Sequence, residues 1–278
     1  MDILQAIIIG IVQGLTEFLP VSSSAHLIFA QHFFNFSSEG LAFDTLVHLA
    51  TLIAVVAFFY KDIVELIKAG WLSIGDILQK RFREGFRNDP YKRMAWLVIL
   101  ASVPVGFVGV FFKTQVEAIF NAGLYVPAFF LFVTGTILYL SQRMAQGNIT
   151  FEKIGVKEAI IIGLAQACAI LPGLSRSGTT IAAGLVMGLD KELAAKFSFI
   201  MSIPAIIGAI IVQIGDIGTE LDANFAAMFF GFLAALISGY FAIKWLINLI
   251  QTKSLDIFAY YCWAVGILVF VGSLIMTI

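Results

Sequence analysis

The segment Gln13 to Leu27 reads QGLTEFLPVSSSAHL, and a second segment, Leu171 to Thr180, reads LPGLSRSGTT. Each places a proline and then serines inside a long apolar run, the first with Glu17 and His26 and the second with Arg176. An ionisable side chain in hydrocarbon costs on the order of 3 kcal/mol or more, so such groups normally face a protein interior or a water-filled cavity. We therefore expect the two segments to meet and to form one site.

The composition of the chain is that of an integral membrane protein. The chain has 278 residues, of which 60% are hydrophobic and 13% charged, and its mean hydropathy is +0.97. A soluble domain is nearer to 45–50% apolar and about 25% charged. Cys168 and Cys262 lie in apolar runs and are expected to be buried small hydrophobes rather than disulfide or metal ligands. Because the first apolar run contains Glu17 and lacks a basic start, no removable signal peptide is expected.

The expected fold is an all-α bundle that forms one membrane domain over residues 1–278. Apolar runs of about 20 residues suit helices that span a bilayer. They predict six transmembrane helices, at 41–60, 94–112, 124–140, 197–214, 225–245 and 257–278. Segments 3–36 and 156–188 are broken by Pro20 and Pro172–Gly173, and we expect each to enter the membrane and return to the same side. Residues 63–88 are expected to form a surface amphipathic helix whose basic face contacts solvent and lipid headgroups, not nucleic acid.

The two halves of the chain resemble each other. With a shift of 153 residues, five positions of the first half align with identical residues of the second: Ile9, Gly10, Gln13, Ser22 and Ser24 with Ile162, Gly163, Gln166, Ser175 and Ser177. Residues 1–142 and 156–278 each contain one broken segment followed by three spans. Because three is odd, the second repeat is expected to be inverted, so that the two hairpins meet near the midplane, as in inverted-repeat transporters.

The distribution of basic residues predicts the topology. Four loops, 61–93, 143–157, 189–196 and 244–253, contain 15 of the 17 lysines and arginines. Cytoplasmic loops carry such an excess, so we expect these loops on the cytoplasmic side and both termini outside. Loop 215–223, on the opposite side, is acidic. The charges favour a re-entrant segment at 156–188. For 3–36 they do not distinguish a re-entrant segment from one that crosses the membrane.

The second motif is expected to bind an anion. Arg176 has a planar guanidinium that suits phosphate or carboxylate. Nearby hydroxyls, and free backbone amides after Pro172–Gly173 at a helix start, would add to the site. The structural alternative is that Arg176 caps a helix or pairs with Glu17.

The first motif offers an acid, hydroxyls and an imidazole. Gln13 and Glu17 lie one helical turn apart, and Glu17 would hold a divalent cation, act as a base or neutralise Arg176. His26 is a candidate general base or nucleophile, with a structural role as the alternative. The serines at 22–24 are candidate nucleophiles or helix caps. Asp44 and His48 would flank the site, where a structural role is preferred. Together these groups fit phosphoryl transfer, with a metal bridging phosphate oxygens.

Gln13 to His26 resembles the (E/Q)xxxE and PVSSxxH motifs of the bacterial undecaprenyl-diphosphatase family, the bacitracin-resistance type. Leu171 to Thr180 resembles the PGxSRSxxT motif of that family, and the FDTLVHLATLIAVV run is also similar. The resemblance covers nearly the whole chain. It implies an inner-membrane phosphatase that converts undecaprenyl diphosphate to the monophosphate and inorganic phosphate, recycles the lipid carrier of peptidoglycan synthesis and confers bacitracin resistance.

The resemblance also implies roles for particular residues. Catalytic roles carry over to Glu17, Ser23, His26 and Arg176, with Mg²⁺ or Ca²⁺ at Glu17, and phosphate contacts are expected from Gln13, Ser22, Ser24, Ser175, Ser177 and Thr180. Gln13 stands where some members have Glu, and Ser24–Ala25 replaces the commoner Thr-Gly. The nucleophile, Ser23, His26 or water, stays open, as does a homodimer. The alternative function is an inverted-repeat transporter or lipid flippase for prenyl phosphates.

Overall fold

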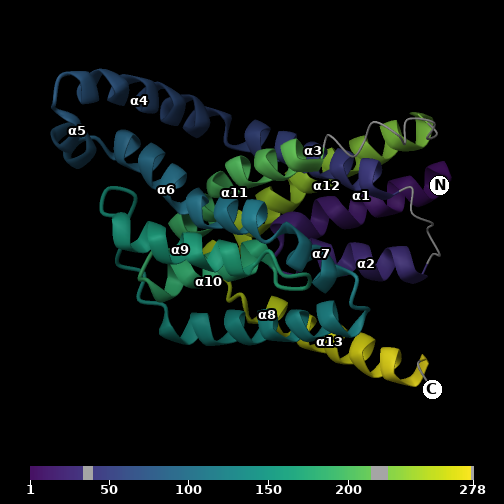
Figure 1. The fold of residues 1–278 in the computed structure, drawn as a ribbon. Helices are drawn as coiled ribbons and strands as arrows, with labels where there is room; N and C mark the ends of the chain where they lie inside the picture. The colour runs from purple at the N-terminus through teal and green to yellow at the C-terminus, as the bar shows by residue number, and fades with distance from the viewer. Residues whose placement is uncertain (34–39, 214–224, 277–278) are drawn as a thin grey trace.

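The computed structural model describes residues 1–33, 40–213 and 225–276, and these ranges form a helical bundle (Figure 1). The helices are α1 (Ile3–Phe18), α2 (Ser23–Phe33), α3 (Gly40–Phe58), α4 (Tyr60–Leu78), α5 (Phe82–Asn88), α6 (Pro90–Phe111), α7 (Lys113–Phe120), α8 (Tyr125–Met144), α9 (Val156–Cys168), α10 (Arg176–Val186), α11 (Lys191–Gln213), α12 (Phe225–Thr252) and α13 (Asp256–Met276). The expected all-α class is confirmed.

Helix length and composition identify a multi-pass membrane protein. Among the described residues, α6, α8, α11, α12 and α13 are long and apolar enough to cross a bilayer. Helix α3 gives a sixth candidate when it is joined to α4, from which it is bent by 84°. Five of the predicted spans overlap α6, α8, α11, α12 and α13, and the sixth, 41–60, overlaps α3 and only the first residue of α4. Helix α11 begins at Lys191 and α12 continues to Thr252, so both extend beyond the apolar runs.

Two local features differ from the sequence-based expectation. The amphipathic helix expected over 63–88 is divided into α4 and α5, and Lys80 between them has a φ of +58°, in the left-handed region. Helix α7 was not expected at all, because its mixed composition gives no apolar run. Residues 34–36 of the first broken segment, the acidic loop 215–223 and positions 277–278 lie outside the described residues.

Both broken segments are helix–turn–helix units. The second unit returns to the end from which it starts, since the Ile149 amide donates to the Gly188 carbonyl (2.8 Å) and the Asp190 amide donates to the Ile149 carbonyl (3.0 Å). The chain just before α9 therefore lies beside the chain just after α10. A hairpin that enters and leaves a membrane on one side requires this arrangement.

The basic loops lie together at one end of the bundle. Three contacts connect them: Lys196 Nζ with Asp62 Oδ1 (2.7 Å), Arg93 with the Glu152 carbonyl, and Lys191 Nζ with the Lys253 carbonyl (3.4 Å). The start of α1 and the end of α13 lie at the opposite end from α5 (Figure 1). The arrangement agrees with the sidedness inferred from the charges, while the orientation in a membrane stays a prediction.

Glycines allow the hairpin helices to pack closely against spans of the other half. Helix α1 packs along α12, and α9 packs along α6. A Cβ on Gly10 would lie 2.2 Å from the Gly231 carbonyl oxygen, and a Cβ on Gly163 would lie 2.4 Å from that of Ala101. Small residues at such interfaces let helix backbones approach. Gly10 and Gly163 are one of the aligned pairs, so this reciprocal packing supports the inverted repeat, which stays a prediction.

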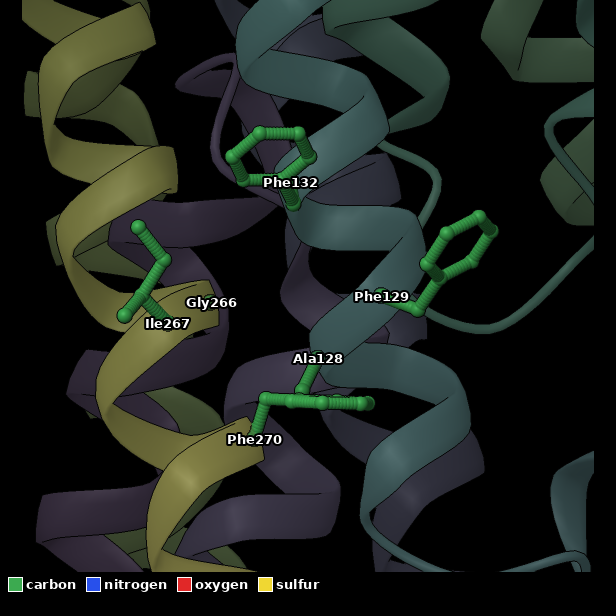
Figure 2. Close-up of a pocket in the computed structure, with 6 residues that line it drawn as sticks. All are labelled: Ala128, Phe129, Phe132, Gly266, Ile267 and Phe270. Atoms are coloured by element: carbon green, nitrogen blue, oxygen red, sulfur yellow. The ribbon is translucent and has the colours of Figure 1, made fainter.

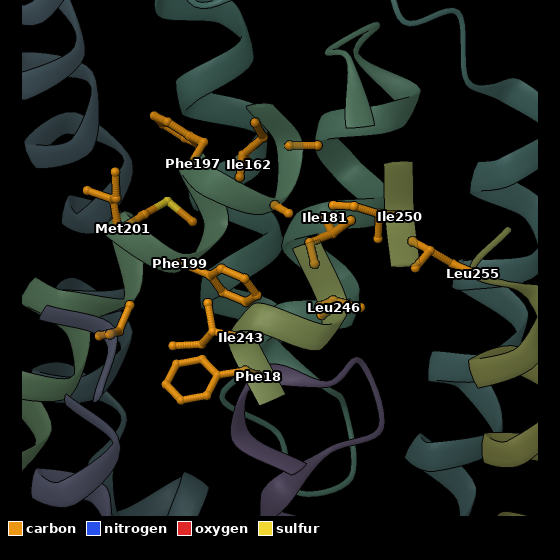
Figure 3. Close-up of a cluster of buried hydrophobic side chains, with 14 of the residues drawn as sticks. Phe18, Ile162, Ile181, Phe197, Phe199, Met201, Ile243, Leu246, Ile250 and Leu255 are labelled. Atoms are coloured by element: carbon orange, nitrogen blue, oxygen red, sulfur yellow. The ribbon is translucent and has the colours of Figure 1, made fainter. Parts of the chain in front are cut away.

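The apolar core lies where α1, α9 and α10 meet α11 and α12 (Figure 3). The Phe18 and Phe199 rings pack edge to face, with their centroids 5.6 Å apart. Both side chains are fully buried. Such pairs add stability beyond the area that they bury, so the core fixes the end of α1 next to Glu17.

Helices α8 and α13 pack side by side at the edge of the bundle. A groove between them is lined only by apolar residues (Figure 2): Ala128, Phe129, Phe132, Gly266, Ile267 and Phe270. This surface suits hydrocarbon chains.

Candidate active site

The two sequence motifs are in contact through the turns of their hairpins. The Gly173 amide donates to Ser24 Oγ (3.2 Å), and Ser177 Oγ donates to the Leu19 carbonyl (3.1 Å). These bonds join residues that are about 150 positions apart in the sequence. The expectation that the motifs meet is therefore correct.

The Glu17 carboxylate lies at the centre of this junction. Its Oε1 accepts from Arg176 Nη2 (2.7 Å), and its Oε2 accepts from Ser23 Oγ (2.7 Å) and Gln13 Nε2 (3.1 Å). Glu17 is only 8% exposed. A buried carboxylate is tolerated when charge and hydrogen bonds compensate for lost water. Three donors from both motifs supply that compensation.

The first hairpin brings Ser23 to Glu17 through a sharp turn. Helix α1 ends at Phe18, and Ser22 in the turn has a φ of +69°, which is uncommon for a residue with a side chain. Ser22 Oγ accepts from the Ala25 amide (3.4 Å) and so caps α2. Ser23 is the first residue of α2, where its hydroxyl points back to the carboxylate.

The second hairpin places Arg176 at the first position of α10. Ser175 is the N-cap, and its Oγ accepts from the Gly178 amide (3.1 Å). Gly173 has a φ of +94°, and a Cβ there would lie 2.2 Å from the Pro127 carbonyl oxygen. Only glycine fits both constraints. Thr134 Oγ1 on α8 accepts from the Ser175 amide (3.0 Å) and so fixes the same turn.

The expectation of free amides after Pro172–Gly173 is partly wrong. Four of these amides donate to atoms of the protein itself: Gly173, Leu174, Ser175 and Gly178. The structure shows no acceptor for the amides of Arg176 and Ser177 within its described ranges. The candidate anion site therefore consists of the guanidinium and these two amides at the start of α10.

Three hydroxyls of the second motif are buried and hydrogen-bonded within the protein. Ser175, Ser177 and Thr180 are at most 1% exposed. Thr180 Oγ1 donates to the Arg176 carbonyl (2.7 Å) and is hydrogen-bonded to Ser198 Oγ (2.6 Å). The Ser198 carbonyl accepts from Arg176 Nη1 (3.4 Å). Direct phosphate contact by these three hydroxyls stays a prediction.

The serines on either side of Ser23 hold the first turn in the same way. Ser22 is 3% exposed, and its Oγ lies 3.2 Å from Ser24 Oγ. Ser24 Oγ also accepts from Gly173, across the two motifs. Contact of Ser22 or Ser24 with phosphate stays a prediction as well.

Two histidines lie near the site in different settings. His26 does not contact Glu17; its Nδ1 lies 2.8 Å from the Ser22 carbonyl and its Nε2 lies 2.7 Å from the Tyr261 hydroxyl. His48 is nearer to the acid, with Nε2 4.0 Å from Glu17 Oε2, and its Nδ1 donates to the Asp44 carbonyl (2.7 Å). His48 is therefore nearer to the Glu17 carboxylate than His26 is, and the catalytic role expected of His26 stays a prediction.

A divalent cation has a limited set of oxygen donors here. Within the described ranges no group of three or more His, Cys, Asp or Glu side chains is placed to hold a metal. Gln13 Oε1 is buried and has no hydrogen-bond partner among the described residues. It lies one helical turn from the Glu17 carboxylate. Hard cations prefer oxygen ligands and accept the remaining ones from substrate phosphates. Binding of Mg²⁺ or Ca²⁺ by these two side chains stays a prediction.

Sequence reasoning missed three residues that support the site. Thr134 and Ser198 are polar positions in predicted spans, which is the signal that could have marked them. Tyr261 gave no such signal, because tyrosine is common in membrane helices. The Asp44 carboxylate accepts from Gln31 (3.0 and 3.1 Å), and its expected place beside the site stays a prediction.

The fold and the site define a multi-pass membrane protein with an acid, a hydroxyl and a guanidinium joined at its centre. A family model described as bacitracin resistance protein BacA matches residues 6–268, and the chain belongs to this family. Several relatives are named undecaprenyl-diphosphatase. The chain is similar to that of Methanobrevibacter smithii (70% identity, 99% of both chains), Methanosphaera stadtmanae (46%, 99% of this chain and 100% of the relative) and Alkaliphilus metalliredigens (41%, with the same coverage).

Proposed function

We propose that this chain is a membrane phosphatase that hydrolyses undecaprenyl diphosphate to undecaprenyl phosphate and inorganic phosphate. The names and full-length similarity of its relatives support this function. The observation that carries the proposal is the contact of Arg176 and Ser23 with one carboxylate, that of Glu17. This arrangement brings together a guanidinium that can bind phosphate, a hydroxyl that can attack phosphorus and a carboxylate that can accept the proton of the hydroxyl.

Arg176 is the anchor for the terminal phosphate. Its guanidinium forms two parallel hydrogen bonds with phosphate oxygens in the geometry that arginine favours. The Arg176 side chain is 17% exposed, so part of it is accessible to a ligand. The amides of Arg176 and Ser177 add a second set of donors at the N-terminus of α10. Catalysis of phosphoryl transfer depends mainly on such positioning and charge stabilisation.

Ser23 is the nucleophile that the geometry supports best. Its Oγ–H donates to Glu17 Oε2 at 2.7 Å, the distance at which a base accepts a proton. Attack of Oγ on the terminal phosphorus breaks the bond to the bridging oxygen, which leaves with undecaprenyl phosphate, while the proton passes to Glu17. Water then attacks the phosphoserine, releases inorganic phosphate and restores the hydroxyl. His26 as nucleophile is less favoured, because both of its ring nitrogens are hydrogen-bonded. Its role in turnover is that of a general base, with Nε2 as the nitrogen that accepts a proton.

A divalent cation would be held by Glu17 and Gln13 Oε1. When bound, Mg²⁺ or Ca²⁺ neutralises phosphate charge and polarises the phosphorus–oxygen bond. Gln13 contributes a neutral oxygen where some family members have a carboxylate, so this chain should hold the ion more weakly. Arg176 already neutralises Glu17, and the phosphate must draw the guanidinium away before the carboxylate is free for a cation.

The substrate tail requires an apolar path from the site into the membrane. The apolar groove between α8 and α13 (Figure 2) is one such surface. We place the protein in the plasma membrane with the basic loops in the cytoplasm and both termini outside. Release of the monophosphate at the outer face would recycle the carrier for peptidoglycan synthesis. A larger amount of the enzyme would leave less diphosphate for bacitracin and so raise resistance.

The function is tested with purified protein in detergent and undecaprenyl diphosphate. Release of inorganic phosphate is measured with and without Mg²⁺, Ca²⁺ and a chelator. Wild-type turnover that Arg176→Ala and Glu17→Ala abolish supports the enzyme. Movement of the lipid between leaflets of a vesicle without phosphate release would instead support the transporter or flippase. Mass measurement of the solubilised protein tests the homodimer.

A further inference from the structure

Tyr261 on the last helix contacts His26 in the first hairpin, although 235 positions separate them in the sequence. The Tyr261 hydroxyl lies 2.7 Å from His26 Nε2. The two rings are also stacked, with their centroids 5.7 Å apart and an angle of 11° between their planes. One side chain therefore constrains both the ring plane and the outer nitrogen of the histidine.

The donors and acceptors around His26 assign its protons. Nδ1 lies 2.8 Å from the Ser22 carbonyl, which can only accept, so Nδ1 carries a proton. In a neutral imidazole the other nitrogen then has a lone pair. Nε2 therefore accepts the hydrogen bond, and the Tyr261 hydroxyl donates it.

We propose that Tyr261 is a positioning residue that fixes the orientation of the His26 ring, whose Nδ1–H tautomer is set by the Ser22 carbonyl. The inference rests on the proposed phosphatase function only for the claim that His26 acts in turnover. A group that hydrogen-bonds one ring nitrogen decides which nitrogen is available for chemistry. Here the Ser22 carbonyl and the Tyr261 hydroxyl hold the ring from its two edges and keep Nε2 as the proton acceptor.

The two residues that follow Tyr261 on α13 also form contacts that fix its position relative to the first motif. Cys262 Sγ donates to the Pro20 carbonyl (3.6 Å), in the turn between α1 and α2. Trp263 Nε1 donates to Thr136 Oγ1 on α8 (3.1 Å). Three consecutive residues of α13 thus contact three different parts of the site and its support, so the position of the Tyr261 hydroxyl is determined by packing as well as by its own hydrogen bond.

The chain offers a matched control for this contact. Tyr260 is the preceding residue of the same helix, and its ring packs against Tyr139 and Trp263 instead of His26. Tyr261→Phe removes one hydroxyl and keeps the stacked ring, and Tyr260→Phe removes a hydroxyl that His26 does not contact. We expect Tyr261→Phe to lower kcat about tenfold with KM nearly unchanged, and Tyr260→Phe to leave both constants unchanged.

A double-mutant cycle shows whether Tyr261 acts through His26. In a His26→Gln background, Tyr261→Phe should cause no further loss of kcat, because the two residues act as one unit. Additive losses, or equal effects of Tyr261→Phe and Tyr260→Phe, would overturn the proposal.

Nitrogen NMR tests the contact without any assay of turnover. The chain has three histidines, and ¹⁵N-labelled imidazoles can be assigned by loss of one set of signals in His26→Gln. The wild-type protein should show the Nδ1–H tautomer for His26, and Tyr261→Phe should shift its Nε2 signal. An unshifted Nε2 signal in Tyr261→Phe would contradict the proposal even when the protein hydrolyses its substrate. A protein that releases no phosphate but shows the shift refutes the proposed function alone.

Discussion

Glu17 Oε1 and Arg176 Nη2 lie 2.7 Å apart, and this buried ion pair joins two hairpins whose residues are 159 positions apart in sequence. Each partner cancels the charge that the other would otherwise carry into an apolar interior. The pair also sets a condition on ligands. A bound anion must interact with the guanidinium more strongly than the carboxylate does. A diphosphate, which has several charged oxygens, can do so.

Arg176→Lys tests whether the site needs the shape of the guanidinium or only its charge. Lysine keeps the positive charge but cannot form two parallel hydrogen bonds with one phosphate. We expect kcat/KM for undecaprenyl diphosphate to fall about 100-fold. Arg143→Lys is the control, because Arg143 is half exposed and pairs with Asp256 near the surface. Wild-type rates for both variants would contradict the assignment.

Glu17→Gln tests the carboxylate as a base. The amide keeps the size of the side chain but does not take the proton of Ser23, and it leaves the guanidinium without a counter-charge. We expect kcat to fall about 1,000-fold and the thermal midpoint of unfolding to fall as well. Glu117→Gln, in an exposed pair with Lys113, should change neither quantity. Retention of kcat in Glu17→Gln would exclude the base mechanism.

The variants Ser23→Ala and Ser24→Ala distinguish a catalytic serine from one that stabilises the contact between the two turns. Ser23 Oγ donates to the carboxylate, whereas Ser24 Oγ accepts from the Gly173 amide and joins the two turns. Ser23→Ala should abolish turnover with little effect on folding. Ser24→Ala should lower the stability by about 1 kcal/mol, the usual loss for one hydrogen bond, and keep measurable activity. Acid-quenched reactions with ³²P-labelled substrate should trap label on the wild type and none on Ser23→Ala; substantial turnover by Ser23→Ala would indicate direct attack by water.

Gly10→Ala and Gly163→Ala test the two close helix contacts. The new methyl group would meet a backbone carbonyl oxygen at 2.2 Å on α12 or 2.4 Å on α6, which cannot move aside cheaply. We expect each change to destabilise the protein by about 1–3 kcal/mol. Gly106→Ala in α6 meets no described atom within 4 Å and should be neutral or slightly stabilising. Thermal unfolding in detergent provides the comparison, and equal midpoints for all three variants would refute the packing argument.

Labelling of single cysteines tests the membrane orientation. In a background without Cys168 and Cys262, Asn148→Cys lies at the basic end of the bundle. Gln115→Cys lies on α7, past the far end of α6, whose 22 residues span about 33 Å. An impermeant maleimide added to intact cells should label Gln115→Cys only. Labelling of Asn148→Cys alone would reverse the orientation that we propose.

The sequence was sufficient for the apolar spans and for the meeting of the two motifs. Long apolar runs give spans directly, and Glu17 and Arg176 are costly in hydrocarbon, so both were expected inside the protein. Their direct pairing was one of the alternatives that the sequence left open. Helix α7 and the break at Lys80 were not predictable in this way, since neither involves an apolar run. They depend on how the loops pack between the spans that they connect.

The hydrogen-bond partners and neighbours of His26 and His48 could also not be predicted from the sequence. His26 belongs to a recognisable motif, but the partner of its Nε2, Tyr261, comes from the opposite end of the chain. His48 lies near Glu17 because α3 packs against α1, and no local pattern reports that contact. The prediction of free amides at Gly173 and Ser175 failed for a similar reason, because their acceptors, Ser24 and Thr134, lie on other elements.

The position of Tyr261 and Cys262 on α13 has a consequence for biosynthesis. The ribosome translates the first motif early and the residues that hold its histidine and its turn nearly last. The active site of a nascent chain is therefore incomplete during most of membrane insertion. The protein can become active only after α13 has packed against the rest of the bundle. Truncation before α13 would yield a membrane-inserted but inactive product.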